Sequence, residues 1–317
     1  MKILMAFFRL IRLPNVVFIS LSQLLFYNCI IIPLMQISHV QHHNILSFRL
    51  LLLLIISSAL IAAAGYIIND YFDINIDQIN KPGKMVVEKY IKRRTAILLH
   101  FIFTVVGILL SIYVGWFTNF IVPIANVACC ILLWFYSTTF KKKLLTGNIL
   151  ISLLTAWTIV VLYVAMFNIY ADNIFTSKDI LESTKRIYMF TTLYAGFAFI
   201  ISLVREVVKD MEDMEGDARY GCKTMPLVWG VTAAKVFAAV WLVVLIGAIL
   251  LVQFYALYSG WWWSCVYSLL FLILPLVWIF NKLYNAQTSL EFHKVSSVIK
   301  LVMLFGILSM VVIKLYL

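Results

Sequence analysis

Two short acidic segments carry aspartates at the same spacing. The first is "NDYFDINID", residues 69–77, and the second is "KDMEDMEGD", residues 209–217. The shared positions are Asp70, Asp73 and Asp77 in the first segment, and Asp210, Asp213 and Asp217 in the second. The chain has only 14 acidic residues, and each segment follows a long apolar run. This repetition indicates one site built from two motifs rather than two ordinary acidic loops.

The spacing predicts what the aspartates can bind. On a helix, offsets of three and seven residues place carboxylates within about 60° of one another, along about 10 Å of the axis. The amide oxygen of Asn69 can join Asp73, four residues later, and Lys209 takes the same place in the second motif. Like charges on one helix face repel each other, so a cation must offset them. Carboxylates suit Mg²⁺, which often also binds a substrate phosphate. We therefore expect Mg²⁺ and a diphosphate.

Basic residues near the motifs are candidate ligands of that diphosphate. Lysine and arginine bind phosphate oxygens and stabilise a diphosphate as it leaves. Two lysines follow the first motif in "QINKPGK", and another begins the run "KKK" at residues 141–143. The residues expected to bind the diphosphate are Lys81, Lys84, Lys141, Arg12 and Lys209.

The composition predicts whether the helices that carry these motifs lie in water or in a lipid bilayer. Of the 317 residues, 64% are apolar and only 12% are charged, and the mean hydropathy is +1.00. Soluble domains contain about 45–50% apolar and about 25% charged residues. The long apolar runs lack period-two alternation, so we expect an all-α polytopic membrane protein. The net charge of +11 fits basic cytoplasmic loops and gives no reason to expect a nucleic-acid partner.

Nine transmembrane helices account for the apolar runs. We expect them at residues 13–36, 48–68, 95–116, 118–138, 147–169, 187–206, 233–255, 261–281 and 296–316. With the amino terminus inside, lysines and arginines are concentrated in the inside loops, so we predict a cytoplasmic amino terminus. Both acidic motifs then open on the cytoplasmic side and can face one cavity. The expected location is a bacterial inner membrane.

The chain is expected to form a single domain, residues 1–317, made of two related halves. In each half, a span ending in the acidic motif precedes a basic loop and a helical hairpin. A parallel repeat about an axis along the membrane normal would bring the motifs together. The approximate halves are 1–146 and 147–295, with an extra helix at 296–317.

Four segments resemble the UbiA superfamily of membrane prenyltransferases. "NDYFDINID" resembles its first motif, and "DMEDMEGDARYGCKTMP" resembles its second. "WFYSTTFKKKLLTGNILIS" resembles a third segment of the family, and "LIRLPNVVF" resembles the segment around Arg12 and Asn15. The resemblance implies nine helices around a central cavity, Mg²⁺ held by both motifs, a polyprenyl diphosphate donor, a lipophilic acceptor and contact with membrane lipid. It implies the metal ligands Asn69, Asp70, Asp73 and Asp77, together with Asp213 and Asp217; the repeated spacing adds Asp210. The expected catalytic residues are Asp73, Asp77, Asp213 and Asp217.

One departure from the family pattern bears on the acceptor. Many members follow the first motif with R-T-x-x-R-P, whereas this chain has "NKPGKMVVEKY". The difference argues against the hydroxybenzoate branch and haem O synthase. "INKP" with "KDMEDMEGD" looks like the branch of geranylgeranylglycerol-phosphate geranylgeranyltransferases. That branch predicts geranylgeranyl transfer to geranylgeranylglycerol phosphate.

Three alternatives stay open at this point. An aromatic-acceptor prenyltransferase of quinone biosynthesis would use the same metal site. A transporter with an acidic cation site would give no covalent product and would need a sealed membrane. A lipid-binding or scaffold protein ranks third, because it gives no reason for six aligned acids. No general base stands out; Asp77 and Asp210 are the candidates.

Overall fold

The computed structural model describes residues 2–37, 46–80, 85–174 and 178–317. These residues form helices and no strand, apart from one isolated bridge between Val87 and Ile91. Nine of the described helical segments are long and apolar enough to cross a membrane. They are Leu13–Gln36, Phe48–Phe72, Arg93–Phe117, Ile121–Thr138, Thr146–Met166, Lys178–Glu212, Val231–Tyr258, Trp262–Asn285 and Ser289–Tyr316. The expected all-α fold with nine spans is confirmed.

The sixth span differs most from its predicted bounds. The sequence predicted residues 187–206, whereas helix α9 runs over Lys178–Glu212. The charged segments at both ends of the apolar run continue as helix. The acidic residues that begin the second motif therefore belong to a helix that also enters the membrane.

The chain divides into two compact units, which are described separately. Unit 1 comprises residues 1–141 and 157–192, and unit 2 comprises residues 142–156 and 193–317. Helices α8 (Thr146–Ile174) and α9 contribute to both units. The predicted halves, 1–146 and 147–295, stay a prediction.

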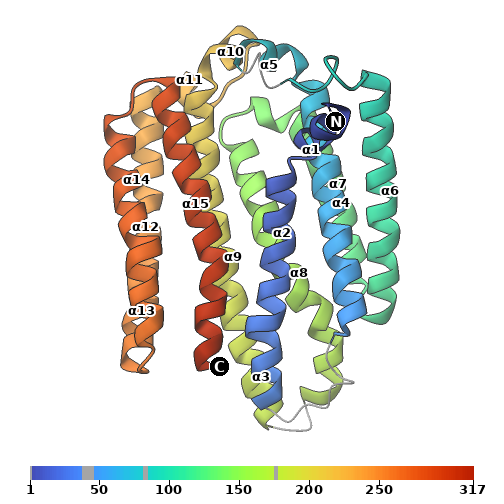
Figure 1. The fold of residues 1–317 in the computed structure, drawn as a ribbon, viewed down its shortest axis with the longest axis vertical. Coiled ribbons are helices and arrows are strands. Elements are labelled where there is room, and N and C mark those ends of the chain that lie inside the picture. The colour runs from blue at the N-terminus through green and yellow to red at the C-terminus, as the bar shows by residue number, and fades with distance from the viewer. Residues whose placement is uncertain (1, 38–45, 81–84, 175–177) are drawn as a thin grey trace. The chain divides into compact units, whose positions relative to one another are not determined.

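Helix α4 organises unit 1. It runs over Phe48–Phe72 and packs against α2 (Leu13–Phe26), α6 (Arg93–Phe117) and α7 (Ile121–Thr138) (Figure 1). Its small residues in "SSALIAAAG" allow a close approach, as is typical of membrane helices. Ser57 Oγ donates a hydrogen bond of 2.7 Å to the carbonyl of Gly107 on α6. The short elements of this unit are α1 (Lys2–Leu10), a π-helical turn (Tyr27–Ile31), α3 (Ile32–Ile37) and α5 (Ile74–Asn80).

Helix α15 (Ser289–Ile313) is antiparallel to the part of α9 in unit 2. Near one end, Glu212 on α9 contacts His293. Near the other, the hydroxyls of Tyr194 and Ser309 lie 2.9 Å apart. Between these contacts, Gly306 leaves room for the ring of Phe197. The unit also contains α10 (Met214–Arg219), α11 (Met225–Val228), α12 (Val231–Tyr258), α13 (Trp262–Ser268), a π-helical turn (Leu269–Ile273) and α14 (Leu274–Asn285).

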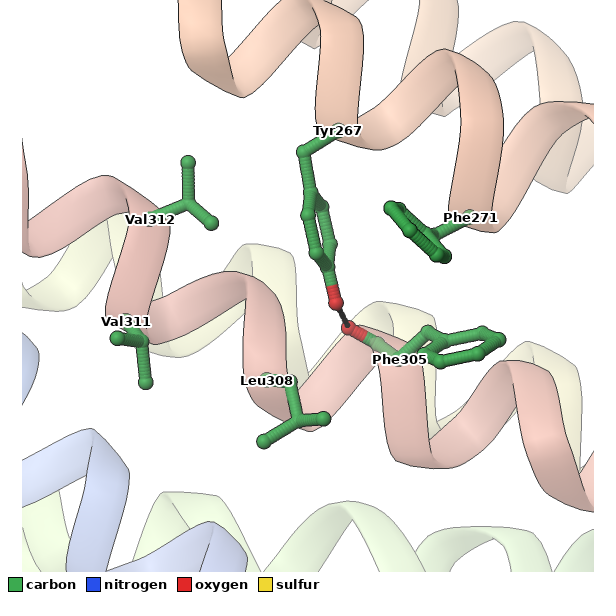
Figure 2. A pocket seen from close by; sticks show the side chains of 6 residues that line it. All are labelled: Tyr267, Phe271, Phe305, Leu308, Val311 and Val312. Carbon is green, nitrogen blue, oxygen red and sulfur yellow. Dashed lines mark hydrogen bonds between the residues drawn. The ribbon is translucent and has the colours of Figure 1, made fainter.

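An apolar cavity of about 370 Å³ lies beside the π-helical turn of unit 2. Figure 2 shows the hydroxyl of Tyr267 donating to the carbonyl of Phe305, at 2.8 Å. The lining residues are Tyr267, Phe271, Phe305, Leu308, Val311 and Val312. None of them belongs to the acidic motifs, so this cavity is not the predicted metal site.

Candidate functional site

The first acidic motif contains a break between two helices. Helix α4 ends at Phe72, Asp73 has φ −89° and ψ 0°, and α5 begins at Ile74. The main chain still pairs on both sides, because Asp73 N–H donates to the carbonyl of Asn69 at 3.0 Å and Asp77 N–H donates to that of Asp73 at 2.8 Å. The prediction of one continuous helix through the motif was wrong. Sequence periodicity could not reveal a change of conformation confined to one residue.

Arg12 binds the first aspartate of this motif. Its Nη2 lies 2.9 Å from Asp70 Oδ1, and its guanidinium lies over the ring of Tyr66, 5.0 Å from the centroid. Arg12 has φ 49° and ψ 54° in the short link between α1 and α2. Burial alone would lower the pKa of Arg12, but the charges of Asp70, Tyr66 and Asp73 and the hydrogen bond to Asp70 together outweigh burial and raise it. Arg12 therefore stays cationic beside the carboxylate.

Lys141 and Asn69 bind the middle aspartate. Lys141 lies in the 3₁₀ turn Phe140–Lys142, which follows α7, and its Nζ forms an ion pair with Asp73 Oδ2. Asn69 Nδ2 donates to the same oxygen at 2.7 Å. Asp73 is only 4% exposed. Burial alone would lower the pKa of Lys141, but the charges of Asp73, Tyr136 and Asp77 and the hydrogen bond to Asp73 together raise it above the usual lysine value.

The first motif offers oxygen atoms that suit a hard cation. Among the described residues, Asn69 Oδ1 is one of the few buried side-chain atoms with no hydrogen-bond partner. A buried amide oxygen without a partner is costly, and Mg²⁺ would satisfy it. The described residues nevertheless contain no group of three His, Cys, Asp or Glu side chains already gathered as a metal site. Arg12 and Lys141 bind the carboxylates of Asp70 and Asp73 instead. These ion pairs neutralise the two carboxylates when no metal ion is bound. The residue types therefore fit Mg²⁺, but the full ligand set stays a prediction.

The second motif has the same kind of break. Helix α9 ends at Glu212, Asp213 has φ −96° and ψ 8°, and α10 begins at Met214. Asp217 N–H donates to the carbonyl of Asp213 at 3.2 Å, and the Asp217 side chain is buried.

Neighbouring helices of unit 2 hold the residues around this break. Asn148 Nδ2 on α8 donates to Asp210 Oδ2 at 2.8 Å. On α15, Ser289 Oγ donates to the carbonyl of Glu212 at 2.9 Å, and His293 Nδ1 lies 2.7 Å from Glu212 Oε1. The last turn of α9, directly before the break, is thus held by contacts from elements distant in the sequence.

The predicted basic residues fall into three groups. Arg12 and Lys141 contact the first motif directly. Lys209 Nζ binds Glu206 Oε1, one turn earlier on α9, at 3.1 Å. Lys81 and Lys84 lie outside the described residues.

The sequence interpretation missed three residues near the motifs: Tyr66, Glu206 and Arg205. Tyr66 lies four residues before Asp70, and Glu206 lies four residues before Asp210, so the helical spacing could have revealed both. Arg205 and Glu206 also stand out as charges within a predicted span.

Comparison with known sequences identifies related proteins. The profile of the UbiA prenyltransferase family matches residues 30–304. A digeranylgeranylglyceryl phosphate synthase of Methanosphaera stadtmanae is 25% identical over 252 residues, which cover 79% of this chain and 82% of the relative. A protein of the same name from Sulfurisphaera tokodaii is 31% identical over 241 residues, which cover 76% of each chain.

Solved structures share the fold. One, concerned with digeranylgeranylglyceryl phosphate synthase in membranes, matches with a TM-score of 0.64 and 24% identity, and covers both chains completely. A UbiA homologue from Archaeoglobus fulgidus bound to GPP and Mg²⁺ matches with a TM-score of 0.55 and 16% identity. That match covers 96% of this chain and 99% of the homologue. The predicted UbiA-like bundle is confirmed.

Proposed function

Since the chain belongs to the UbiA prenyltransferase family, we propose that it transfers a geranylgeranyl group from geranylgeranyl diphosphate to geranylgeranylglyceryl phosphate. The choice of substrates is supported by relatives named digeranylgeranylglyceryl phosphate synthase, which include the 31% identical protein of S. tokodaii. The observation that carries the proposed chemistry is the first motif, where Arg12 and Lys141 each hold an aspartate. A basic residue paired with a carboxylate is ready to bind a phosphate oxygen once a cation occupies the carboxylate.

The first motif supplies the donor end of the site. Arg12 and Lys141 bind diphosphate oxygens and stabilise the negative charge that grows as the bond from C1 to oxygen breaks. Their raised pKa values keep both residues cationic at neutral pH. Lys209, and Lys81 and Lys84 outside the described residues, are further candidate ligands.

Mg²⁺ is the proposed cofactor of both motifs. Its ligands would be drawn from Asn69, Asp70, Asp73, Asp77, Asp210, Asp213 and Asp217. When bound, Mg²⁺ would neutralise the diphosphate and help it to leave. The A. fulgidus homologue was solved with GPP and Mg²⁺, which supports the choice of Mg²⁺ as cofactor.

Chain topology supports the same side of the membrane for the two motifs. Helices α6 to α9 separate the motifs along the chain, and all four are long and apolar enough to cross a membrane. Four crossings return the chain to the side on which it started. The concentration of lysine and arginine in the same loops supports a cytoplasmic site. The predicted bacterial inner membrane stays a prediction.

The transfer itself replaces one bond to C1 by another. The acceptor hydroxyl oxygen attacks C1 of the donor, diphosphate leaves, an ether bond forms and the hydroxyl proton is released. Asp77 and Asp210 are the candidates to accept that proton. Apolar residues of the spanning helices exclude water, which would otherwise capture the allylic group.

Product analysis tests this function. The purified protein in detergent is incubated with geranylgeranyl diphosphate, Mg²⁺ and either geranylgeranylglyceryl phosphate or 4-hydroxybenzoate. We expect mass spectrometry to detect the ether product with the first acceptor and no prenylated ring with the second. Product formed only from the aromatic acceptor would contradict the substrate assignment. Turnover in detergent would also exclude a requirement for a sealed membrane, which the transporter alternative has.

A further inference from the structure

A polar stripe leads from the second motif into the membrane-spanning part of α9. At about 100° per residue, Ser202, Arg205, Glu206 and Lys209 fall on one side of the helix. Arg205 lies seven residues before the end of α9 at Glu212, which corresponds to about 10 Å along the axis. Ionisable residues at such depth are expensive and are usually retained for function. The groups in and around this stripe are therefore candidates to bind a ligand.

Arg205 is incompletely satisfied within this stripe. Its side chain is 17% exposed, and its Nη1 lies 3.2 Å from Glu206 Oε1. The same carboxylate oxygen also accepts from Lys209 Nζ at 3.1 Å. Arg205 Nε is buried and has no hydrogen-bond partner within the part of the chain that the structure describes. Glu206 Oε1 thus contacts two cations, and the buried Nε–H of Arg205 has no acceptor among the described residues.

Other polar groups of unit 2 surround the stripe. On α8, Thr155 Oγ1 lies 3.3 Å from Ser202 Oγ, and Asn148 binds Asp210. On α15, the contacts of Glu212 with His293 and of Phe197 with Gly306 define an antiparallel register. Interpolation between these contacts places Lys300 within one helical turn of the level of Arg205.

We propose that Arg205 binds the phosphate monoester of the acceptor lipid. The planar guanidinium presents N–H donors in a fork that matches phosphate oxygens, and Nε is the donor still available. The inference rests on the proposed function, because geranylgeranylglyceryl phosphate carries its phosphate on the glycerol carbon next to the nucleophilic hydroxyl. The donor diphosphate is assigned to the acidic motifs, Arg12 and Lys141. Arg205 lies about two turns before Asp213, so a phosphate held there would keep the neighbouring hydroxyl near the second motif.

This subsite gives a physical reason for acceptor choice. A lipid alcohol without a phosphate would offer no anionic oxygen to the buried Nε of Arg205. A phosphate monoester presents anionic oxygens that can accept from this donor. The preference for a phosphate-bearing acceptor should therefore depend on the guanidinium of Arg205. Other basic residues near the second motif should not affect this preference.

A binding experiment without Mg²⁺ tests the assignment. The probes are geranylgeranylglyceryl phosphate and geranylgeranylglycerol, which lacks the phosphate. The variants are Arg205→Gln, Arg205→Lys and, as a control, Arg219→Gln, which changes an exposed arginine of α10. Binding of geranylgeranyl diphosphate in the presence of Mg²⁺ checks that each variant is folded.

The wild type should bind the phosphate lipid at least tenfold more tightly than the alcohol. In Arg205→Gln this preference should fall to threefold or less, with the Kd of the alcohol unchanged, whereas Arg219→Gln should keep it. In Arg205→Lys the preference for the phosphate lipid over the alcohol should fall at least threefold, because lysine retains the charge but lacks Nε. If Arg205→Gln does not fold, the Arg205→Lys result decides. No preference in the wild type, or full preference in the folded variants, would overturn the assignment.

Turnover separates the subsite from the proposed function. If the ether product forms in wild type and Arg205→Gln with the same acceptor KM, the subsite is wrong and the function stands. If selective binding depends on Arg205 but no ether product forms, the subsite stands and the proposed transfer is wrong.

Discussion

Asp73 and Asp213 adopt nearly the same backbone conformation, with φ −89° and ψ 0° in the first and φ −96° and ψ 8° in the second. Each is the single non-helical residue between a long helix and a short one. This region of conformational space is sparsely populated and is common among active-site residues. Two motifs with the same aspartate spacing therefore also share a local shape, which supports equivalent roles for the two middle aspartates.

Removing either middle carboxylate should abolish transfer. For Asp73→Asn and Asp213→Asn we expect kcat/KM to fall by about 100-fold or more, because an amide is a weaker ligand for Mg²⁺ and carries no charge. Diphosphate release measured at saturating Mg²⁺ checks this. Asp179→Asn, which changes an exposed residue in the first turn of α9, is the control and should retain activity. Wild-type rates in either motif variant would show that the metal assignment is wrong.

Asn69 should determine the affinity for the metal. Its Oδ1 is buried without a partner in the described residues, while its Nδ2 holds Asp73. Asn69→Ala removes both groups, so the Mg²⁺ concentration for half-maximal activity should rise by about 10- to 100-fold. Titration of EDTA-treated protein with Mg²⁺ measures this shift. The control is Asn285→Ala, an exposed amide at the end of α14. An unchanged Mg²⁺ requirement in Asn69→Ala would remove Asn69 from the metal site.

The ion pair of Lys141 with Asp73 should be insensitive to pH over the usual assay range. The pKa of Lys141 is raised, so its stabilisation is fully present below the ordinary lysine pKa, about 10.4, and is lost only as pH rises through the higher folded value. Lys141→Met leaves a buried carboxylate without its cation and should destabilise the fold by about 1–3 kcal/mol. We expect the difference in Tm between wild type and Lys141→Met to stay constant from about pH 7 to about pH 9.5. A difference that shrinks with rising pH would show that Lys141 loses its proton in this range. Lys142→Met, at the neighbouring exposed lysine, serves as the control.

Arg12 should not be replaceable by lysine. Its guanidinium binds Asp70 and lies over the ring of Tyr66 at the same time, and an ammonium group cannot reproduce this planar contact. We expect Arg12→Lys to raise the KM for geranylgeranyl diphosphate by about tenfold, which corresponds to about 1.4 kcal/mol. Arg9→Lys, which changes a more exposed arginine on α1, should leave KM unchanged. Equal KM values in wild type and Arg12→Lys would show that charge alone is needed.

The sequence predicts the spans and the motifs but not the pairing around them. Long apolar runs determine nine helices because the backbone must satisfy its own hydrogen bonds in lipid. The aspartate spacing identifies the two motifs because it repeats. By contrast, Arg12 and Asp70 are separated by 58 residues, Lys141 and Asp73 by 68, and Asn148 and Asp210 by 62. These contacts depend on how helices pack, which no local pattern encodes. The breaks at Asp73 and Asp213 are each confined to one residue, so periodicity alone predicted continuous helices.

Gly115 lies where α6 packs closely against α7 in unit 1, so a larger side chain should destabilise the protein. A Cβ built on this residue would lie 2.5 Å from Cδ of Pro123, whose ring cannot rotate away. Gly115→Ala should therefore separate α6 from α7 and destabilise the protein by about 1–3 kcal/mol. Gly247→Ala on α12 is a matched control, since a Cβ at that position would meet nothing within 4 Å and alanine favours helix. Thermal unfolding in detergent should show a lower Tm for Gly115→Ala and an equal or higher Tm for Gly247→Ala. Equal Tm values for wild type and Gly115→Ala would mean that α6 and α7 do not pack this closely.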